Sequence, residues 1–245
     1  MKGVILAGGT GSRLAPVTKV INKHLLLCYD QPMIFYPIQM LVKAGITEIC
    51  IVTGGESSNG FFPLLQNGDA FGITNLQYRY QVGSGGIAAA LKLTERFADG
   101  DKICVVLGDN IIEKDINQAV ADFKVQESGA KILLKEVQDP ERFGVAEMDE
   151  DRVIGIEEKP KAPKSNNAVT GIYFYDSTVF DKARTLVPSE RGELEITDIN
   201  NAYLKEGTLT AAFLDGWWTD AGTYDSLLKA SILVAQKAGR MVSWQ

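Results

Sequence analysis

The sequence has few cysteines and histidines, and its three cysteines show no metal-binding spacing. Its 245 residues include three cysteines and one histidine. Cys28, Cys50 and Cys104 are widely spaced and form no CxxC pair, which argues against a disulfide framework or a zinc site. We therefore expect free thiols and a reducing, cytoplasmic environment.

Positive charge and long hydrophobic runs are also scarce. There are 25 Lys and Arg against 31 Asp and Glu, a net charge of −6, whereas nucleic acids and anionic membranes favour basic surfaces. The longest apolar runs, such as residues 104–107, are too short to span a bilayer. The apolar N-terminus stops at Gly8, so residues 2–7 predict a first buried strand rather than a signal peptide. We expect neither nucleic acid nor a membrane as partner.

Apolar runs and amphipathic segments alternate in the first half of the chain. We expect strands at residues 2–7, 48–52 and 102–107 and helices at 33–44 and 85–97. This alternation predicts an α/β fold with a mostly parallel sheet covered on both faces. Such sheets bind ligands beyond the carboxyl ends of their strands, where glycine-rich segments follow each of these three strands.

The second half contains shorter strand-like segments separated by turn signals. Strands are expected at 129–137, 152–158 and 168–175, a loop leading into a helix at 188–201, and a helix at 225–237. No repeat, low-complexity tract or linker interrupts the chain. We therefore expect one domain over residues 1–245.

The loop after the first strand is the strongest local signal. It reads Gly8-Gly9-Thr10-Gly11-Ser12-Arg13-Leu14, and consecutive glycines let backbone amides approach phosphates closely. Leu14 stands where the dinucleotide fingerprint needs glycine, and the Walker Gly-Lys-Ser/Thr ending is absent. A plain tight turn is the alternative, but the nearby cations Arg13, Lys19 and Lys23 favour a triphosphate.

This loop, extended to Pro16 and joined by Thr18, Lys23 and residues 30–34, resembles the signature of the sugar nucleotidyltransferases. The same resemblance continues in residues 107–110, 139–145, 157–160, 168–173, 191–200 and 217–223. The order and spacing of these segments, over nearly the whole chain, make the resemblance specific. Within the family it is closest to the short-form enzymes that join dTTP to α-D-glucose 1-phosphate, giving dTDP-glucose and pyrophosphate.

The resemblance implies a Rossmann-like three-layer αβα sandwich of the nucleotide-diphospho-sugar transferase type. Residues 1–110 would bind the nucleotide and residues 111–245 the sugar. It also implies Mg²⁺ as cofactor, a homo-oligomer (dimer or tetramer) and a place in dTDP-sugar biosynthesis. The sugar phosphate would attack the α-phosphorus in line; because it is already ionised at neutral pH, no general base is required.

Catalytic roles in the family fall on Arg13, Lys23 and Asp109. Arg13 would brace the leaving pyrophosphate, and Lys23 would neutralise charge at the α-phosphate. Asp109 and Asp220 would hold the metal. The residues alone leave open a solvated lysine at 23 and a turn residue at 109.

Substrate-binding roles also follow from the resemblance. Gln81, at a strand end, could read the imide edge of thymine or uracil, because its amide donates and accepts at once, but it cannot distinguish the two bases. The alternatives are an exposed strand-end glutamine at Gln81, a charged strand edge at residues 157–159 and core packing of Trp217 and Trp218. The nucleotide set is Leu6, Gly8, Gly9, Gly11, Ser12, Arg13, Gln81, Gly86 and Asp109; the sugar set is Phe143, Gly144, Glu158, Lys159, Thr170, Tyr173 and Trp218.

Four departures from the family pattern leave the substrate pair open. They are Ala15, Leu27-Cys28, Ala89 and Phe143. UTP or another hexose 1-phosphate therefore remains an alternative substrate. A non-catalytic sugar-nucleotide-binding subunit is a further alternative, which the retention of all four catalytic and metal residues disfavours. Because residues 241–245 stop short of the longer family form, extra C-terminal helices with an allosteric site are not expected.

Overall fold

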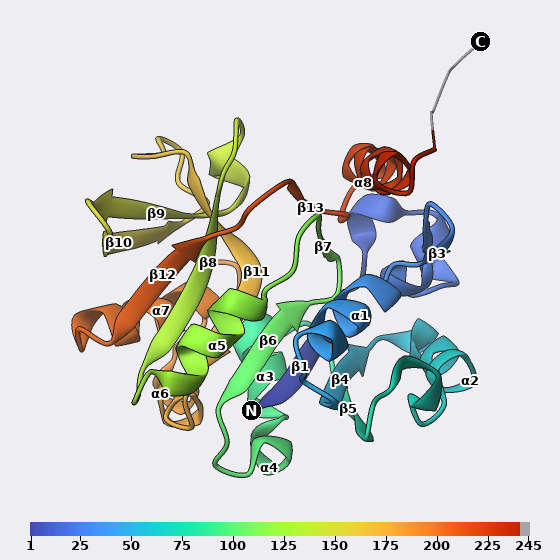
Figure 1. Cartoon of the computed structure of the whole chain (residues 1–245), viewed down its shortest axis with the longest axis horizontal. Helices are drawn as coiled ribbons and strands as arrows, with labels where there is room; N and C mark the ends of the chain where they lie inside the picture. Colours follow the sequence, from blue (N-terminus) through green and yellow to red (C-terminus); the bar gives the residue numbers. More distant parts are fainter. Residues whose placement is uncertain (241–245) are drawn as a thin grey trace.

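A nine-stranded sheet forms the centre of the fold (Figure 1). The computed structural model describes residues 1–240, except the side chains of Glu56 and Ser57, so residues 241–245 and the expectation attached to them lie outside it. The strand order is β10-β9-β11-β6-β1-β4-β5, with β8 between β11 and β12. The strands are β1 (Lys2–Ala7), β4 (Glu48–Gly54), β5 (Asn75–Gln81), β6 (Ile103–Leu107), β8 (Ala130–Glu136), β9 (Gly144–Asp149), β10 (Arg152–Glu158), β11 (Asn167–Tyr175) and β12 (Leu209–Phe213).

The four strands β6, β1, β4 and β5 are parallel, as the buried apolar runs predict. Their register aligns Leu6 with Val52 and with Leu107, and Gly54 with Gln81. The carboxyl ends of all four strands therefore meet at one edge. This confirms the predicted parallel centre of the sheet and brings the segments that follow β1, β4 and β6 together.

The other half of the sheet is mixed, because β11 runs antiparallel to β6, β8 and β9. It also contains β9 and β12, which the hydrophobic pattern does not reveal. Two short ribbons lie outside the sheet: β13 (Trp218–Asp220) with β7 (Asn110–Ile112), and β2 (Leu27–Cys28) with β3 (Gln31–Pro32). The first ribbon places Asp220 opposite Asn110.

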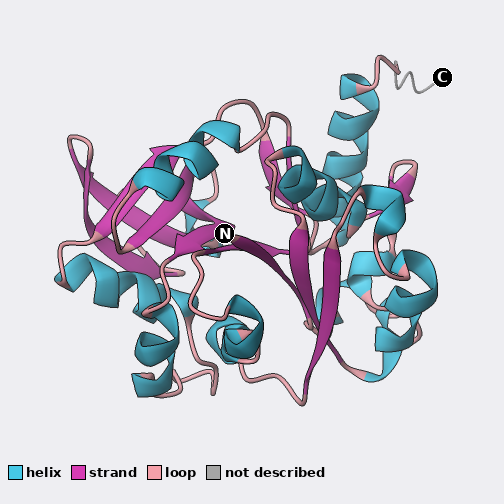
Figure 2. Cartoon of the chain, turned by 60° about the horizontal axis from the view of Figure 1, so that its bottom comes forward, coloured by secondary structure: helices cyan, strands magenta, loops and turns pink. Residues whose placement is uncertain are grey.

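Helices cover both faces of the sheet, as expected for a three-layer sandwich (Figure 2). One apolar core joins Val4 and Val105 to α3 (Ile87–Lys92), α4 (Glu95–Ala98), α6 (Val179–Thr185) and α7 (Ile196–Lys205). The opposite core joins Ile5 and Val106 to α1 (Phe35–Lys43), α2 (Phe61–Leu65) and α5 (Asn117–Val125). The predicted helix 85–97 is two helices, and between them the Thr94 hydroxyl donates to the Leu91 carbonyl at 2.7 Å.

The last helix, α8 (Tyr224–Lys237), confirms the expected C-terminal helix and packs against the N-terminal segment. It begins with a capping box in which Thr223 and Ser226 satisfy each other's backbone amides. The Tyr224 hydroxyl lies 3.0 Å from the Leu14 carbonyl oxygen, to which it donates. The start of α8 therefore lies against the end of the glycine-rich loop.

No helix within residues 1–240 is long and apolar enough to cross a bilayer. Cys28, Cys50 and Cys104 are free and buried. A cytoplasmic location and the division into a nucleotide part and a sugar part stay predictions.

Candidate active site

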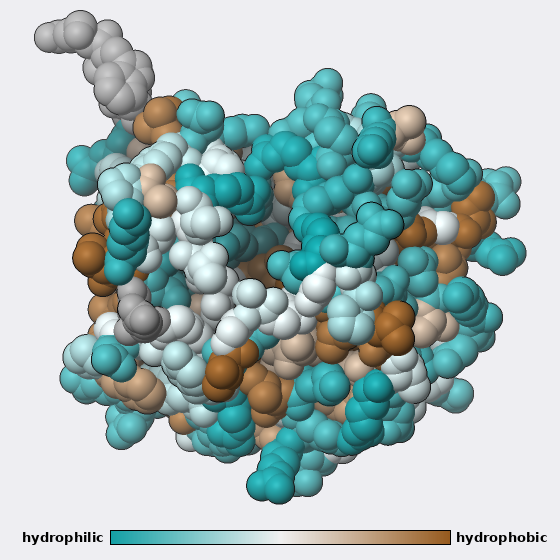
Figure 3. Space-filling model, turned by 180° about the vertical axis from the view of Figure 1, so that it is seen from behind, coloured by the Kyte–Doolittle hydropathy of each residue, from teal (hydrophilic) through white to brown (hydrophobic). Residues whose placement is uncertain are grey.

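The candidate site lies at the carboxyl edge of the parallel strands, where the segments after β1 and β6 touch. The Gly108 amide donates to the Leu6 carbonyl at 2.9 Å, which fixes the two strand ends. In the space-filling view, the surface is hollowed between the α8 side and the β9–β10 side of the molecule (Figure 3).

Asp109 and Lys23 form a close, largely buried ion pair. Lys23 Nζ lies 2.5 Å from Asp109 Oδ2, and the two side chains are 13% and 11% exposed. Burial alone would raise the pKa of Asp109, but the adjacent Lys23 charge and hydrogen bonds from Lys23 and Asn110 hold that pKa below its usual range. Asp109 is therefore a carboxylate at neutral pH.

Asn22 places Lys23 at the end of β1. Its side-chain oxygen accepts from the His24 amide at 2.9 Å and caps the turn Lys23–Leu25, while its side-chain nitrogen donates to the Ala7 carbonyl at 3.2 Å. His24 is 2% exposed, and burial and the charge of Lys23 lower its pKa to about 3. The single histidine is therefore neutral and packed in the interior.

Asp220 and Arg13 reach the same place from distant parts of the chain. A Cβ built on Gly222 would lie 3.5 Å from both Asp109 Oδ2 and Asp220 Oδ2, and 3.1 Å from Arg13 Nη2. Burial and the charge of Asp109 raise the pKa of Asp220. The four residues predicted for phosphate and metal chemistry thus share one small space.

The two carboxylates fit a hard divalent cation. Mg²⁺ is commonly held by one or two carboxylates and completes its six ligands with water and phosphate oxygens. Among the described residues, no group of three or more His, Cys, Asp or Glu side chains could hold a metal. Asp109 and Asp220, which repel each other without a cation between them, suit Mg²⁺ bound together with a phosphate.

Glycine-rich backbone lets Lys23 approach the strand end. Gly11 has φ +65°, and a Cβ there would lie 2.9 Å from Thr18 Cγ2 and 3.1 Å from Lys23 Cβ. A Cβ on Gly9 would meet Lys23 Cε at 3.7 Å. Ser12 and Arg13 follow on an exposed helical turn. The loop therefore lies against the Lys23 side chain, and Arg13 is exposed.

Gln81 lies beside this loop, at the end of β5. Its Nε2 donates to the Gly86 carbonyl at 3.1 Å, and its Oε1 lies 2.9 Å from the Cβ position of Gly8. A Cβ on Gly86, where φ is +90°, would lie 2.6 Å from the Leu194 carbonyl oxygen. The structure brings Gln81 together with Gly8 and Gly86, two of the four glycines in the predicted nucleotide set. Gly86 must be glycine for the segment 189–194 to pack there.

Most of the predicted sugar residues form a second cluster beside the first. Glu158 Oε2 accepts from the Thr197 hydroxyl at 2.7 Å, and a Cβ on Gly144 would lie 3.4 Å from the same oxygen. Lys159 Nζ lies 3.4 Å from Glu158 Oε1, and the Lys159 amide donates to the Phe143 carbonyl. This cluster carries both signs of charge, as recognition of a sugar phosphate requires.

Trp218 joins the two clusters. Its ring centroid lies 5.0 Å from that of Phe143, and its Nε1 donates to Asn110 Oδ1 at 2.7 Å. Asn110 in turn donates to Asp109 Oδ1 at 3.1 Å. Trp218 is 8% exposed, so the core-packing role weighed for it is present together with the link to the site.

Two predicted sugar residues are enclosed. Thr170 is fully buried, and its hydroxyl donates to the Leu133 carbonyl at 2.9 Å. Tyr173 is 3% exposed, and burial, with the charges of Glu158 and Asp109, raises its pKa. It lies between the two clusters as a neutral phenol.

The structure also shows site residues to which the sequence reasoning gave no role. They lie in the motif segments that carry the family resemblance, and those segments are the only feature of the sequence that could have indicated them. Asn110 and Thr197 hydrogen-bond Asp109 and Glu158, whereas Arg191 pairs with Glu158 and Glu195 and Arg142 with Asp220.

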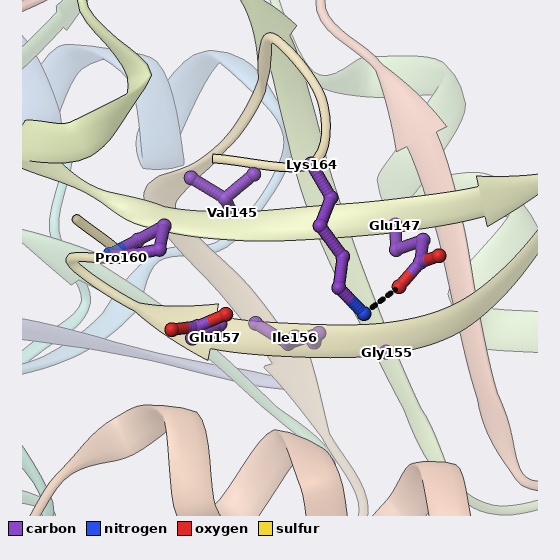
Figure 4. A pocket seen from close by; sticks show the side chains of 7 residues that line it. All are labelled: Val145, Glu147, Gly155, Ile156, Glu157, Pro160 and Lys164. Carbon is purple, nitrogen blue, oxygen red and sulfur yellow. Dashed lines mark hydrogen bonds and ion pairs between the residues drawn. The ribbon is translucent and has the colours of Figure 1, made fainter. Parts of the chain in front are cut away.

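A pocket of about 290 Å³ lies on the other face of the β9–β10 ribbon (Figure 4). Glu157 pairs with Val145 and Glu158 with Gly144, and successive residues of a strand point to opposite faces. The pocket residues Val145 and Glu157 therefore face away from the sugar cluster. Lys164 crosses the pocket to Glu147 at 2.8 Å, and the pocket is separate from the phosphate site.

The chain resembles known proteins along almost its whole length. A family model described as nucleotidyl transferase matches residues 2–237. The chain is 45% identical to the glucose-1-phosphate thymidylyltransferase of Neisseria meningitidis over 238 residues, 96% of this chain and 82% of that protein. It is 42% identical to the enzyme of that name from Mycolicibacterium smegmatis, with the same coverage.

Solved structures give the same result. A Bacillus anthracis protein, assigned as a glucose-1-phosphate thymidylyltransferase and solved with sucrose, is 53% identical and superimposes with a TM-score of 0.92 over 100% of this chain and 97% of its own. A UDP-glucose pyrophosphorylase complexed with UDP-glucose superimposes with a TM-score of 0.83 over 96% of this chain and 98% of its own. At 23% identity, the second likeness shows the fold alone.

Proposed function

The chain belongs to the nucleotidyl transferase family, and on that premise we propose that it is a glucose-1-phosphate thymidylyltransferase. It transfers the thymidylyl group of dTTP to α-D-glucose 1-phosphate and releases pyrophosphate. The observation that carries the proposal is the meeting of Arg13, Lys23, Asp109 and Asp220 around Gly222. Two cations and two carboxylates at the end of a glycine-rich loop are the groups that this reaction needs.

The transfer proceeds by in-line attack of the sugar phosphate oxygen on the α-phosphorus. Such reactions depend on positioning and on neutralising charge. Lys23 turns from Asp109 toward the α-phosphate, and the exposed guanidinium of Arg13 holds the leaving pyrophosphate by paired hydrogen bonds. The nucleophile is already ionised, so the neutral His24 is not needed as a base.

A divalent cation, Mg²⁺, would be held by Asp109 and Asp220. When bound, it neutralises the phosphate oxygens on which negative charge develops. Asn110 orients the first carboxylate through its side-chain nitrogen. The ribbon pair of Asn110 with Asp220 fixes the second carboxylate relative to the first.

Base and sugar are recognised on opposite sides of this centre. Gln81, beside Gly8 and Gly86, reads the imide edge of a pyrimidine. Glu158 accepts bonds from sugar hydroxyls, and Lys159 binds the sugar's phosphate. Phe143 and Gly144 line the approach to Glu158. Separately, we expect the protein to form a homo-oligomer.

A pyrophosphate-release assay across nucleoside triphosphates and sugar 1-phosphates tests the proposal. Turnover should need a divalent cation and should be greatest with dTTP and glucose 1-phosphate, with UTP as the informative competitor. A preference for ATP or GTP would contradict the assignment of Gln81. Binding of dTDP-glucose without any pyrophosphate release would instead identify a non-catalytic subunit.

A further inference from the structure

Asp109 and Asp220, the two carboxylates assigned to the metal, each pair with a cationic side chain in this structure. Lys23 pairs with Asp109, and Arg142 pairs with Asp220, with Arg142 Nη2 3.2 Å from Asp220 Oδ1 and 3.5 Å from Oδ2. Asp220 is 17% exposed and Arg142 36% exposed. The guanidinium therefore covers a carboxylate that the proposed reaction needs for the cation.

Arg142 is also tied to the segment that carries Phe143. Its Nη1 lies 2.6 Å from Asp139 Oδ2, and its guanidinium stacks over the Phe143 ring at 5.1 Å. Phe143 packs on Trp218, and Trp218 and Asp220 belong to the same strand, β13. One side chain thus contacts the metal-facing carboxylate and the approach to the sugar cluster.

The contacts of Arg142 with Asp139 and Phe143 do not depend on Asp220, so they remain when Asp220 binds another cation. Two carboxylates facing each other in a partly buried space repel unless cations neutralise them. An arriving divalent ion competes with the guanidinium for the oxygens of Asp220. Arg142 can release Asp220 because Asp139 and Phe143 still hold it.

We propose that Arg142 is a positioning residue with two roles. It pairs with the Asp220 carboxylate until a divalent cation binds there, and it links that carboxylate to the segment that carries Phe143. This inference rests on the proposed function, because Asp220 is taken as a metal ligand. It adds that metal entry is an exchange of one cation for another. Removing the guanidinium removes the competitor, so the metal-free chain should bind a divalent ion more tightly.

The test is a Mn²⁺ titration of the substrate-free protein, followed by the electron paramagnetic resonance of free Mn²⁺. Arg142→Gln should lower the dissociation constant about two- to fivefold, the range expected for losing one partly exposed ion pair. Lys164→Gln is the matched control, because it removes the same charge from the far face of the β9–β10 ribbon, where Lys164 pairs with Glu147. It should leave Mn²⁺ affinity unchanged.

An Arg142→Gln protein that binds Mn²⁺ equally or more weakly would overturn the inference, as would the failure of both proteins to bind it at millimolar concentrations. Steady-state kinetics test the second half of the proposal. The KM for the sugar phosphate should rise more than the KM for the triphosphate, and equal changes would contradict the tie to Phe143. Because the titration needs no substrate, its failure is separable from absent turnover in wild-type protein, which would contradict the proposed function.

Discussion

The Lys23 ammonium lies 2.5 Å from the Asp109 carboxylate, at the point where β1 and β6 end. Replacing Asp109 by Asn keeps the shape of the side chain and removes the charge that neutralises both Lys23 and a metal. We expect Asp109→Asn to lower kcat at least about a hundredfold, as for loss of one group that stabilises transition-state charge. Pyrophosphate release with saturating Mg²⁺ measures this, and a loss below tenfold would contradict the role of Asp109.

The same pair should be visible in stability. Lys23→Met leaves a carboxylate without its cation, and Asp109→Asn leaves an ammonium without its anion, so each single change is destabilising. The double variant removes both charges and should be more stable than the sum of the two changes predicts, with a coupling energy of roughly 1–3 kcal/mol. Urea unfolding of the four proteins measures the coupling, and additive changes would show that the ion pair contributes nothing.

The sequence predicts the part of the fold that local pattern encodes. β1, β4 and β6 are continuous apolar runs, and each is followed by a glycine, so their common edge can be inferred before any contact is known. β13 is only Trp218–Asp220 and shows no repeating apolar pattern. Its pairing with β7, which carries Asp220 to Asp109, could be expected only from resemblance.

Side-chain pairings in the site are predicted less well than its location. Arg142 lies in an Asp-Pro-Glu-Arg turn, and nothing in that turn indicates that its guanidinium reaches Asp220, because the contact depends on how β9 and β13 pack. Thr170 shows the converse: its motif marks it as a site residue, and only the structure shows that it lies within β11 with its hydroxyl donating to the Leu133 carbonyl.

Gln81 offers a test of base recognition. Gln81→Ala removes the amide that lies between Gly8 and Gly86, and the KM for dTTP should rise roughly tenfold, the effect of one or two lost hydrogen bonds. The KM for glucose 1-phosphate should change little. Gln39→Ala, an exposed glutamine on α1, is the control, and equal increases in both KM values for Gln81→Ala would count against base reading.

His24 predicts a pH dependence of stability. Its pKa falls from 6.5 to about 3 on folding because of burial and the nearby Lys23 charge. Between these two pKa values, His24 binds a proton in the unfolded chain but not in the folded chain. The free energy of unfolding therefore decreases as the pH falls from 6.5 toward 3, by up to about 1.4 kcal/mol per pH unit. Urea unfolding between pH 6.5 and 4.5 should show a shallower decrease for His24→Gln, and identical slopes would mean that His24 already binds its proton in the folded chain.

Gly11 and Gly45 allow the phosphate loop to be tested against a matched position. Both have positive φ, +65° and +74°, so an alanine at either costs about 1 kcal/mol of backbone strain. A Cβ at Gly45 meets nothing within 4 Å, whereas at Gly11 it would press on Thr18 and Lys23.

Both alanine variants should therefore lose similar stability, apart from the crowding at Gly11, but only Gly11→Ala should displace the Lys23 ammonium from the phosphate position. We expect its kcat/KM for dTTP to fall at least about tenfold, since small misplacements of a catalytic group cost one to two orders of magnitude, while Gly45→Ala keeps wild-type kinetics. Thermal melting and initial rates of the two proteins separate strain from displacement. Equal losses of kcat/KM in Gly11→Ala and Gly45→Ala would contradict a displacement of Lys23, because backbone strain alone would then explain both losses.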